Sequence, residues 1–360
     1  MSQPVSEPAA EPVSDSVNTA ASWRVLRPDR ARYHEALERL VGGTDEIRAR
    51  ASAQRLAAHL DCAGRRGEQL ATLASMVDQQ NRIRLTALAV PGMGRTAQVL
   101  VTTIRDAAGA EALGLLLREV CEGLDPRQVA VAQALLDAEP RAEVGSTAGA
   151  HLASTAPDNA PRVSPHAIWM KAAFERAGFT VLAVLDYMTR PVPERRTIDA
   201  PTLPDDVSLG PWRRGDPILL RILESTYVDT LDCPGLCGLR RTEDILEGHL
   251  ASARYEPPLW TVLRVDDRPA GALLLSPSHR SSDGLGSEDC ELVYLGLAPW
   301  ARGRGLGRLL LQHGLAQLSR RSERRITLAV DRANLPAVAL YSSMGFLPGP
   351  ARLALIMPVR

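Results

Sequence analysis

The chain has 360 residues, more than the ~100–200 that one domain ordinarily uses, so its length predicts two domains. Hydrophobic residues make up 45% of it, which is enough for buried cores. The 42 basic and 42 acidic residues cancel, so no overall electric field attracts nucleic acid or an anionic membrane, and neither is expected as a partner.

The cysteines and the N-terminal segment bear on the compartment. Five cysteines, an odd number scattered along the chain, argue against a disulfide framework and favour a reducing, cytoplasmic setting. Cys233 and Cys237 have no second Cys/His pair near them in the sequence, so no metal site is expected. Residues 1–22, rich in Pro, Ser, Ala and acidic residues, predict a disordered tail and not a signal peptide.

The first half alternates between strand-like and helix-like apolar patterns. Strands are expected at residues 23–26, 83–90, 97–104 and 180–188, and helices at 31–40, 51–60, 110–122 and 167–176. The composition of residues 139–164 predicts a long surface loop. Four prolines among the fifteen residues 190–204 indicate an interdomain linker, which we place at 191–205.

The alternation restarts after the linker. Helices are expected at residues 216–228, 242–252, 307–320 and 335–344, and strands at 259–265, 270–276, 291–297, 325–330 and 353–358. This mixed order predicts an α/β (α+β) fold. Tyr341, Gly345 and Phe346 match Phe174, Gly178 and Phe179 in spacing, each set ending a helix and opening a strand-like segment, which indicates an internal duplication.

A glycine–arginine cluster separates the strand expected at 291–297 from the helix expected at 307–320. At such a turn, unpaired amides and the positive end of the helix dipole attract an anion, and Gly303, Gly305 and Gly307 carry no side chains to keep it away. The cluster therefore predicts a phosphate site. It matches neither the P-loop nor the dinucleotide fingerprint, and an arginine-rich surface turn is the alternative.

Two motifs of the second half resemble the GNAT superfamily of acyl-CoA-dependent N-acyltransferases. The run from Arg302 to Gly307 fits the family turn Arg/Gln-x-x-Gly-x-Gly/Ala, and a helix motif is supplied by Asn334, Ala337, Tyr341, Gly345 and Phe346. The resemblance implies two tandem GNAT-like domains, each with a mixed, mostly antiparallel sheet flanked by helices. A degenerate domain would span residues 23–190 and a catalytic N-acetyltransferase domain residues 206–360.

The resemblance also implies the reaction and its ligand. Acetyl-CoA would be the co-substrate, and its acetyl group would pass directly to a primary amine of a small molecule or peptide. The pyrophosphate would lie on the amides of the turn and the pantetheine arm along the preceding strand. The residues expected to bind it are Leu295, Leu297, Arg302, Gly303, Arg304, Gly305, Leu306, Gly307, Arg308 and Asn334. A non-catalytic acyl-CoA sensor on the same scaffold is the alternative.

Two residues are the catalytic candidates. Tyr341 matches the family's usual general acid, with a core tyrosine as the alternative. Glu291 stands six residues before Leu297, where some family members place the general base, although a glutamate that starts a strand is often only solvated. Asn334 shares a helical face with Tyr341, but it can equally cap the helix.

The acceptor pocket and the first half complete the expectations. The resemblance implies that the loop at residues 226–241 lines the acceptor pocket. There Asp229 and Asp232 can hold a cationic amine, and Arg240 and Arg241 an acidic group, with a merely solvated loop as the alternative. In the first half Phe174 replaces the tyrosine, and residues 105–110 hold one glycine and an aspartate that would repel phosphate. One chain is therefore expected to bind one coenzyme A.

Overall fold

The computed structural model describes residues 23–29, 31–42, 72–140, 167–192, 198–252, 255–277 and 289–360, with single positions between 50 and 60. The tail expected at 1–22, most of the loop expected at 139–164 and part of the linker lie outside the described residues, and the helix expected at 51–60 is described only in part. No helix among the described residues is long and apolar enough to cross a membrane.

The described elements of the two halves follow the same order, except that two helices of the second half, and one of the first, stand between the first two strands. The first contains β1 (Arg24–Leu26), α1 (Tyr33–Val41), β2 (Thr72–Val77), β3 (Ile83–Gly92), β4 (Thr96–Val101), α3 (Ala107–Glu122), β5 (Val131–Ala138), α4 (Ile168–Arg176) and β6 (Thr180–Pro191). The second contains β7 (Val207–Pro211), α5 (Ile218–Thr226), α6 (Thr242–Ser252), β8 (Trp260–Val265), β9 (Arg268–Pro277), β10 (Asp289–Leu297), α7 (Leu306–Leu318), β11 (Arg325–Asp331), α8 (Leu335–Ser343) and β12 (Leu347–Pro358).

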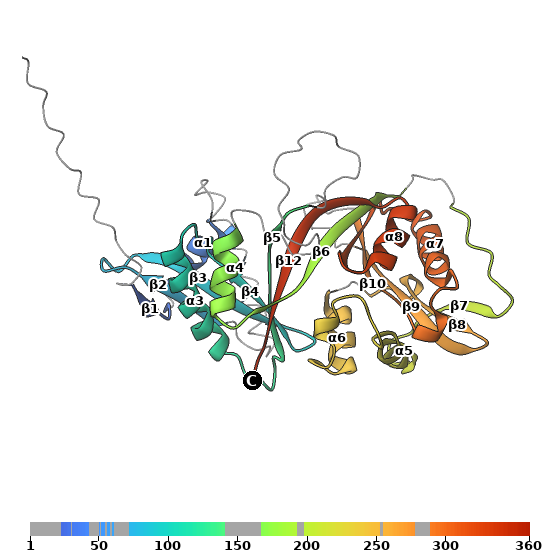
Figure 1. Cartoon of the computed structure of the whole chain (residues 1–360), viewed down its shortest axis with the longest axis horizontal. Coiled ribbons are helices and arrows are strands. Elements are labelled where there is room, and N and C mark those ends of the chain that lie inside the picture. The colour runs from blue at the N-terminus through green and yellow to red at the C-terminus, as the bar shows by residue number, and fades with distance from the viewer. Residues whose placement is uncertain are drawn as a thin grey trace, which may run out of the picture.

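The described strands form one continuous sheet. Its order is β1-β2-β3-β4-β5-β12-β6-β11-β10-β9-β8-β7, and the long strands β6 and β12 lie side by side in the middle (Figure 1). Among these strands only β4 with β5 and β10 with β11 pair in parallel. The predicted fold class, a mixed and mostly antiparallel sheet flanked by helices, is confirmed, and the structure adds that the two half-sheets are joined.

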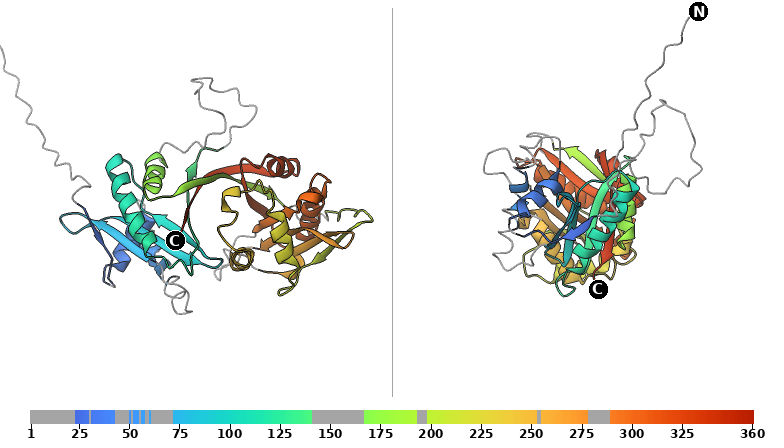
Figure 2. Two further views of the ribbon diagram at one scale, coloured as in Figure 1. Left: turned by 60° about the horizontal axis from the view of Figure 1, so that its bottom comes forward. Right: turned by 90° about the vertical axis from the view of Figure 1, so that its left-hand side faces the viewer.

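The last strand of each half lies in the sheet of the other half. β6 pairs with β11, and β12 pairs with β5 (Figures 1 and 2). Met188 of β6 belongs to the hydrophobic core of the second half, whereas Leu353 and Leu355 of β12 belong to that of the first. Each half therefore covers an edge strand of the other, whose backbone groups would otherwise lack partners. The division into two domains near residue 190 stays a prediction.

The sequence repeat corresponds to a structural repeat. The amide of Phe179 donates to the carbonyl of Phe174 at 3.0 Å, and the amide of Phe346 donates to the carbonyl of Tyr341 at 3.1 Å. In this helix-ending motif the residue between helix and strand has a positive φ, which favours glycine. The two residues at that position are Gly178, with φ +98°, and Gly345, with φ +83°.

Three strands were missed by the sequence analysis: β2, β5 and β7. The sequence of β5, VAQALLDA, consists mostly of helix-compatible residues, and it becomes a strand because β4 and β12 pair with its two edges. The five-residue strand β7 contains a glycine and a proline and lies at the edge of the sheet, where proline is tolerated.

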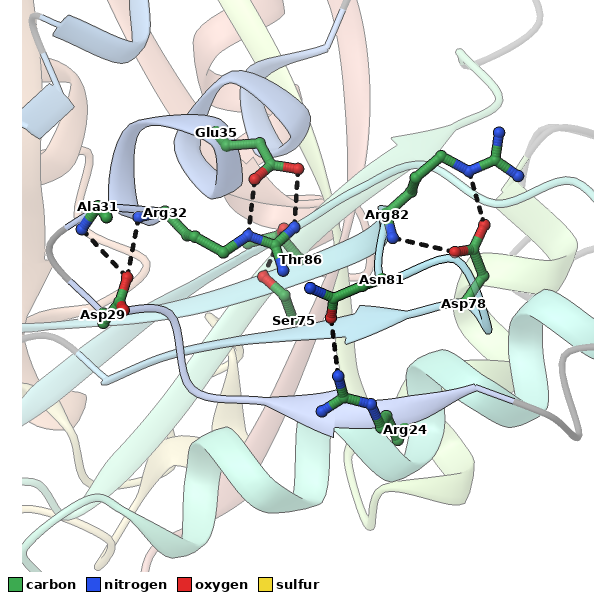
Figure 3. A network of polar contacts seen from close by, with 10 residues as sticks. All are labelled: Arg24, Asp29, Ala31, Arg32, Glu35, Ser75, Asp78, Asn81, Arg82 and Thr86. Atoms are coloured by element: carbon green, nitrogen blue, oxygen red, sulfur yellow. Dashed lines mark hydrogen bonds and ion pairs between the residues drawn. The ribbon is translucent and has the colours of Figure 1, made fainter.

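A polar network fixes the opposite edge of the sheet, around β1 and the turn between β2 and β3 (Figure 3). The carboxylate of Asp78 accepts hydrogen bonds from the amide and the guanidinium of Arg82, at 3.0 and 3.1 Å. Arg24 donates to the side chain of Asn81 at 2.7 Å. These contacts hold the first strand and the tight turn together, at the end of the sheet farthest from β7.

Candidate active site

The strands β10 and β11 separate next to the glycine turn. They pair only at their beginnings, where residues 289–291 face residues 325–327. Beyond Glu291 the pairing of β10 with β9 continues through a register shift to Leu297. In the described chain, the β11-facing edge of residues 292–297 therefore has no strand beside it. Such an edge can pair with an extended ligand that carries amides.

The glycine turn connects β10 to α7 through residues 298–305. The first amide of α7 that reaches a backbone carbonyl is that of Leu309, which donates to Gly305 at 3.1 Å, so the amides before it remain available. Gly303 and Gly305 have φ values of +75° and +77°, and a Cβ atom on either would meet nothing within 4 Å. The turn thus presents free amides and the helix dipole to open space, as an anion site requires.

The side chain of Arg302 is held by the protein itself. Its guanidinium donates to the carbonyl of Leu297 at 3.1 Å and to those of Thr226, Val228 and Asp229 at 2.8–3.0 Å. These carbonyls lie at the ends of β10 and α5, so Arg302 ties the two elements together. A cation at the C-terminus of a helix also complements its dipole.

The other two arginines of the turn also have protein partners. Arg304 pairs with Asp206 at 2.7 Å, and Arg308 donates to the hydroxyl of Ser343 at 2.7 Å. The arginine side chains therefore hold the turn to neighbouring segments, and the backbone amides are its open donors.

Tyr341 lies on α8 and is 6% exposed. Its ring packs against Phe346, with the centroids 5.7 Å apart, and its hydroxyl has no hydrogen-bond partner in the described chain. Burial raises the pKa of this phenol, and the negative charge of Asp232 raises it further. The phenol therefore stays protonated at neutral pH and can donate a proton.

Asn334 caps α8. Its side-chain oxygen accepts a hydrogen bond from the amide of Ala337 at 3.3 Å. Of the two roles that the sequence left open, capping is present in the structure. Contact between Asn334 and a ligand stays a prediction.

Glu291 lies on β10 at the point where the strands separate. The residue is exposed, yet surrounding protein atoms desolvate its carboxyl and raise its pKa. Burial raises the pKa of Tyr187 on β6, and the charge of Glu291 adds to that rise. The charge of the candidate base therefore acts on a residue of the first half. Asp232, and not Glu291, is the carboxylate whose charge acts on Tyr341.

The expected acceptor loop is fixed to the end of β11. The carboxylate of Asp232 accepts from the amide of Asp331 at 3.1 Å, and the carboxylate of Asp331 accepts from the amide of Cys233 at 3.2 Å. Asp229, in contrast, contributes its backbone carbonyl to Arg302. The two aspartates were equivalent candidates in the sequence, and in the structure it is the charge of Asp232 that adds to the effect of burial in raising the pKa of Tyr341.

The first half touches this region through the β3–β4 turn. Arg240 donates to the carbonyl of Gly94 at 3.3 Å, and Arg95 pairs with Asp244 at 3.7 Å. Burial alone would raise the pKa of Asp244, but hydrogen bonds from Arg241 and the charge of Arg95 bring it below its ordinary value. A Cβ on Gly94 would overlap the backbone of α6, so glycine permits this close contact.

Equivalent positions in the first half carry different chemistry. The parallel pairing places Gln98 opposite Gln133 in the register that places Glu291 opposite Thr327. An amide thus stands where the second half has a candidate base. At the N-terminus of α3, the carboxylate of Asp106 accepts from the amide of Gly109 at 2.6 Å. The helix end that would attract phosphate is already occupied by the chain's own carboxylate.

Comparison with known proteins identifies the class. Residues 223–346 match the acetyltransferase (GNAT) family. Mycothiol acetyltransferase from Mycobacterium leprae is 30% identical over 308 residues, which cover 77% of this chain and 89% of that protein. The chain therefore belongs to the GNAT superfamily of acetyltransferases and is a transferase enzyme.

Solved structures agree on the fold. A GCN5-related N-acetyltransferase from Sphaerobacter thermophilus is 17% identical, with a TM-score of 0.53 over 94% of this chain and 96% of that one. A tandem GNAT protein from the clavulanic acid biosynthesis pathway is 15% identical, with a TM-score of 0.51 over 94% and 98% of the two chains. At these identities the likeness concerns the fold alone.

Proposed function

We propose that the protein transfers an acetyl group from acetyl-CoA directly to a primary amine of a small molecule or peptide. The observation that carries this proposal is the open glycine turn at the start of α7, which stands beside the separated strands β10 and β11. A buried phenol without a hydrogen-bond partner, Tyr341, lies in the same half.

The residues fit the parts of acetyl-CoA. The amides from Gly303 to Arg308 would hold the pyrophosphate, because no backbone carbonyl of the described residues accepts from them and they lie at the positive end of the α7 dipole. The open edge of β10 at Leu295 and Leu297 would pair with the amides of the pantetheine arm. Arg302 would act through the position it gives to the turn, since its guanidinium is bound to backbone carbonyls.

The chemistry requires two proton transfers. An amine with a pKa of ~10 must lose a proton before its nitrogen attacks the thioester carbonyl, and the sulfur that leaves must gain one. Glu291 would accept the first proton and Tyr341 would supply the second. The amide of Leu297 would polarise the carbonyl as the carbon–nitrogen bond forms and the carbon–sulfur bond breaks.

We assign this reaction to residues 206–360 and propose that residues 23–190 bind no coenzyme A. Gln98, Asp106 and Phe174 support this assignment, because each removes one function that the second half retains. Cys121, Cys233, Cys237 and Cys290 are free thiols, which supports a cytoplasmic setting. The name of the relative from Mycobacterium leprae makes a mycothiol-related amine the first acceptor to test.

The test is an assay of the full chain with acetyl-CoA and a panel of amines, amino sugars and lysine peptides. Release of the coenzyme A thiol and the acetylated product, detected by mass spectrometry, should both depend on the amine. Tight acetyl-CoA binding without transfer to any amine of the panel would instead support an acyl-CoA sensor.

A further inference from the structure

We infer that the first half positions the coenzyme A site of the second half through the turn between β3 and β4, residues 93–95, which supports α6. The inference rests on the proposed acetyl transfer and gives a task to the half to which we assign no coenzyme A. It follows from a series of contacts that leads from this turn to the side chain of Arg302.

The turn and α6 meet backbone to backbone (Figure 1). A Cβ atom on Gly94 would overlap the carbonyl oxygen of Asp244 and would lie 2.9 Å from the Cα atom of Gly248. Asp244 and Gly248 are four residues apart and therefore lie on one face of α6. A side chain at position 94 has no room, so only glycine allows the turn to approach the helix this closely.

Polar contacts hold the two backbones together. Arg240, shortly before α6, donates to the carbonyl of Gly94 at 3.3 Å, and Arg95 pairs with the carboxylate of Asp244 at 3.7 Å. The side chain of Asp244 is 3% exposed, so water screens this ion pair only in part. The guanidinium of Arg95 also donates to the carbonyl of Pro126 at 2.7 Å. The turn is thus anchored in the first half while it holds α6.

The helix α6 depends on this support because it buries little of its own surface. Among its side chains that the structure describes, that of Asp244 is the only buried one, and the apolar Ile245, Leu246 and Leu250 are half-buried. Burial of apolar surface is the main contribution that fixes a helix on a sheet. The second half by itself therefore holds α6 weakly, and the contact with the first half supplies part of what is missing.

The next residue of α6 carries the contact into the second half. His249 follows Gly248, and its ring lies against that of Tyr294 on β10, with the centroids 5.4 Å apart. Burial lowers the pKa of His249 to about 4, and the charge of Arg240 adds to this effect, so the ring packs as an uncharged aromatic group at neutral pH. Tyr294 is the first paired residue after the register shift in β10, close to where β10 and β11 separate. The position of α6 therefore affects the strand beside which the pantetheine arm would lie.

Two further contacts lead from Tyr294 to the glycine turn. Its hydroxyl is hydrogen-bonded to that of Thr226 at the end of α5. The carbonyl of Thr226 accepts from the guanidinium of Arg302 at 3.0 Å, and Arg302 ties the glycine turn to β10 and α5. A Cβ atom on Gly296 would overlap the hydroxyl of Tyr294, so the tyrosine ring lies closely along its own strand. A displacement of α6 would therefore displace Tyr294 and, through Thr226, the side chain of Arg302.

The chain offers a matched control for a substitution at Gly94. Gly215, in the connection from β7 to α5, also has a positive φ, +93° against +75° for Gly94, but a Cβ atom there would meet no described atom within 4 Å. Alanine causes conformational strain at both positions, and only Gly94→Ala overlaps α6. A difference between the two variants therefore reports the contact with α6 and not the strain.

The experiment compares wild type, Gly94→Ala and Gly215→Ala as full chains labelled with ¹³C in the tyrosine rings, with the Tyr294 signal assigned by its loss in Tyr294→Phe. Without any ligand, the Tyr294 signal should shift in Gly94→Ala and not in Gly215→Ala. In calorimetry, Gly94→Ala should weaken acetyl-CoA binding at least fivefold, and Gly215→Ala should bind it as wild type does. An unmoved Tyr294 signal or wild-type affinity in folded Gly94→Ala, or equal effects of the two variants, overturns the inference.

A milder pair of variants covers the case in which Gly94→Ala does not fold. Arg95→Ala removes the ion pair with Asp244, whereas Arg95→Lys keeps a positive charge there. Arg95→Ala should shift the Tyr294 signal and raise the dissociation constant of acetyl-CoA, and Arg95→Lys should restore most of both. Wild-type behaviour of Arg95→Ala in both measurements contradicts the inference. Because the Tyr294 signal is measured without ligand, absence of acetyl-CoA binding by wild type rejects the proposed function alone, and normal binding by all variants rejects the positioning role alone.

Discussion

Tyr341 and Phe174 end equivalent helices and differ by one hydroxyl group. Both rings are buried against a following phenylalanine, so packing alone does not require the oxygen of Tyr341. The tyrosine hydroxyl has no hydrogen-bond partner among the described residues, and it is not one of their fully buried unpartnered atoms, so it remains accessible to a ligand. This pair of observations is the residue-level argument for a proton donor.

We expect Tyr341→Phe to lower turnover by ~10²–10⁴-fold, the usual contribution of general acid catalysis. Acetyl-CoA binding should hardly change, because the ring still packs as Phe174 does. Steady-state kinetics and calorimetry measure the two effects. Tyr255→Phe is the control, since that hydroxyl donates to the carbonyl of Trp212 and its loss should affect stability but not turnover. Wild-type turnover in Tyr341→Phe would exclude the phenol as the acid.

Glu291→Gln should remove the acidic limb of the pH–rate profile. A base acts only when ionised, so the wild-type rate should fall as the pH drops through the pKa of Glu291, which desolvation places above its ordinary value. Gln98 shows that the fold accommodates an amide at the equivalent position. Asp289→Asn, on the same strand, should leave the profile unchanged. A wild-type pH–rate profile in Glu291→Gln would show that Glu291 is only a solvated surface residue and not the base.

At the scale of elements, the beginnings of α7 and α3 differ in what fills them. Two glycines with positive φ leave the N-terminus of α7 open, whereas the carboxylate of Asp106 caps the N-terminus of α3. The same pairing of strand and helix therefore gives an anion site in one half and a satisfied cap in the other.

We expect Gly305→Asp to abolish acetyl-CoA binding in calorimetry while the chain stays folded. Its side chain would point into open space, so no clash is introduced, and the left-handed conformation costs about 1–2 kcal/mol for a residue other than glycine. Gly305→Asn carries the same conformational cost without the charge and should retain more affinity. Wild-type affinity in folded Gly305→Asp would show that the pyrophosphate binds elsewhere.

At the scale of the whole molecule, the exchange of β6 and β12 makes the halves mutually dependent. A chain that ends near residue 193 would lack β12, the partner of both β5 and β6, and would leave two edges of the first half unpaired. The number of coenzyme A sites is therefore best measured on the intact chain.

Titration of the intact chain with acetyl-CoA should give a stoichiometry near one. Binding in the first half would have to overcome the carboxylate of Asp106, which occupies the helix end where a phosphate would lie. Gly305→Asp provides the internal check, because it should reduce the stoichiometry from one to zero. A value near two for wild type, or near one for Gly305→Asp, would show that the first half also binds coenzyme A.

Local pattern was sufficient for much of the fold and for the outline of the site. The spacing of Gly303 and Gly305 before an apolar helix predicted the open turn, and the spacing of Tyr341, Gly345 and Phe346 predicted the helix end, because these features depend on residues that are neighbours in the chain. The strand β5 was missed because its residues are compatible with a helix and only its partners make it a strand.

The long-range contacts came only from the tertiary structure. Sequence alone determined the family motifs, the α/β class and the duplication, since each is written in short-range spacing. The tertiary structure alone showed that β6 and β12 exchange between the halves, and that Gln98 holds the register position equivalent to that of Glu291. It also showed that, beyond burial, the charge of Asp232, and not that of Asp229, raises the pKa of Tyr341. The physical reason is that strand pairing and electrostatic interactions connect residues that are far apart in the chain. The local spacing of residues does not determine which distant residue each of them contacts.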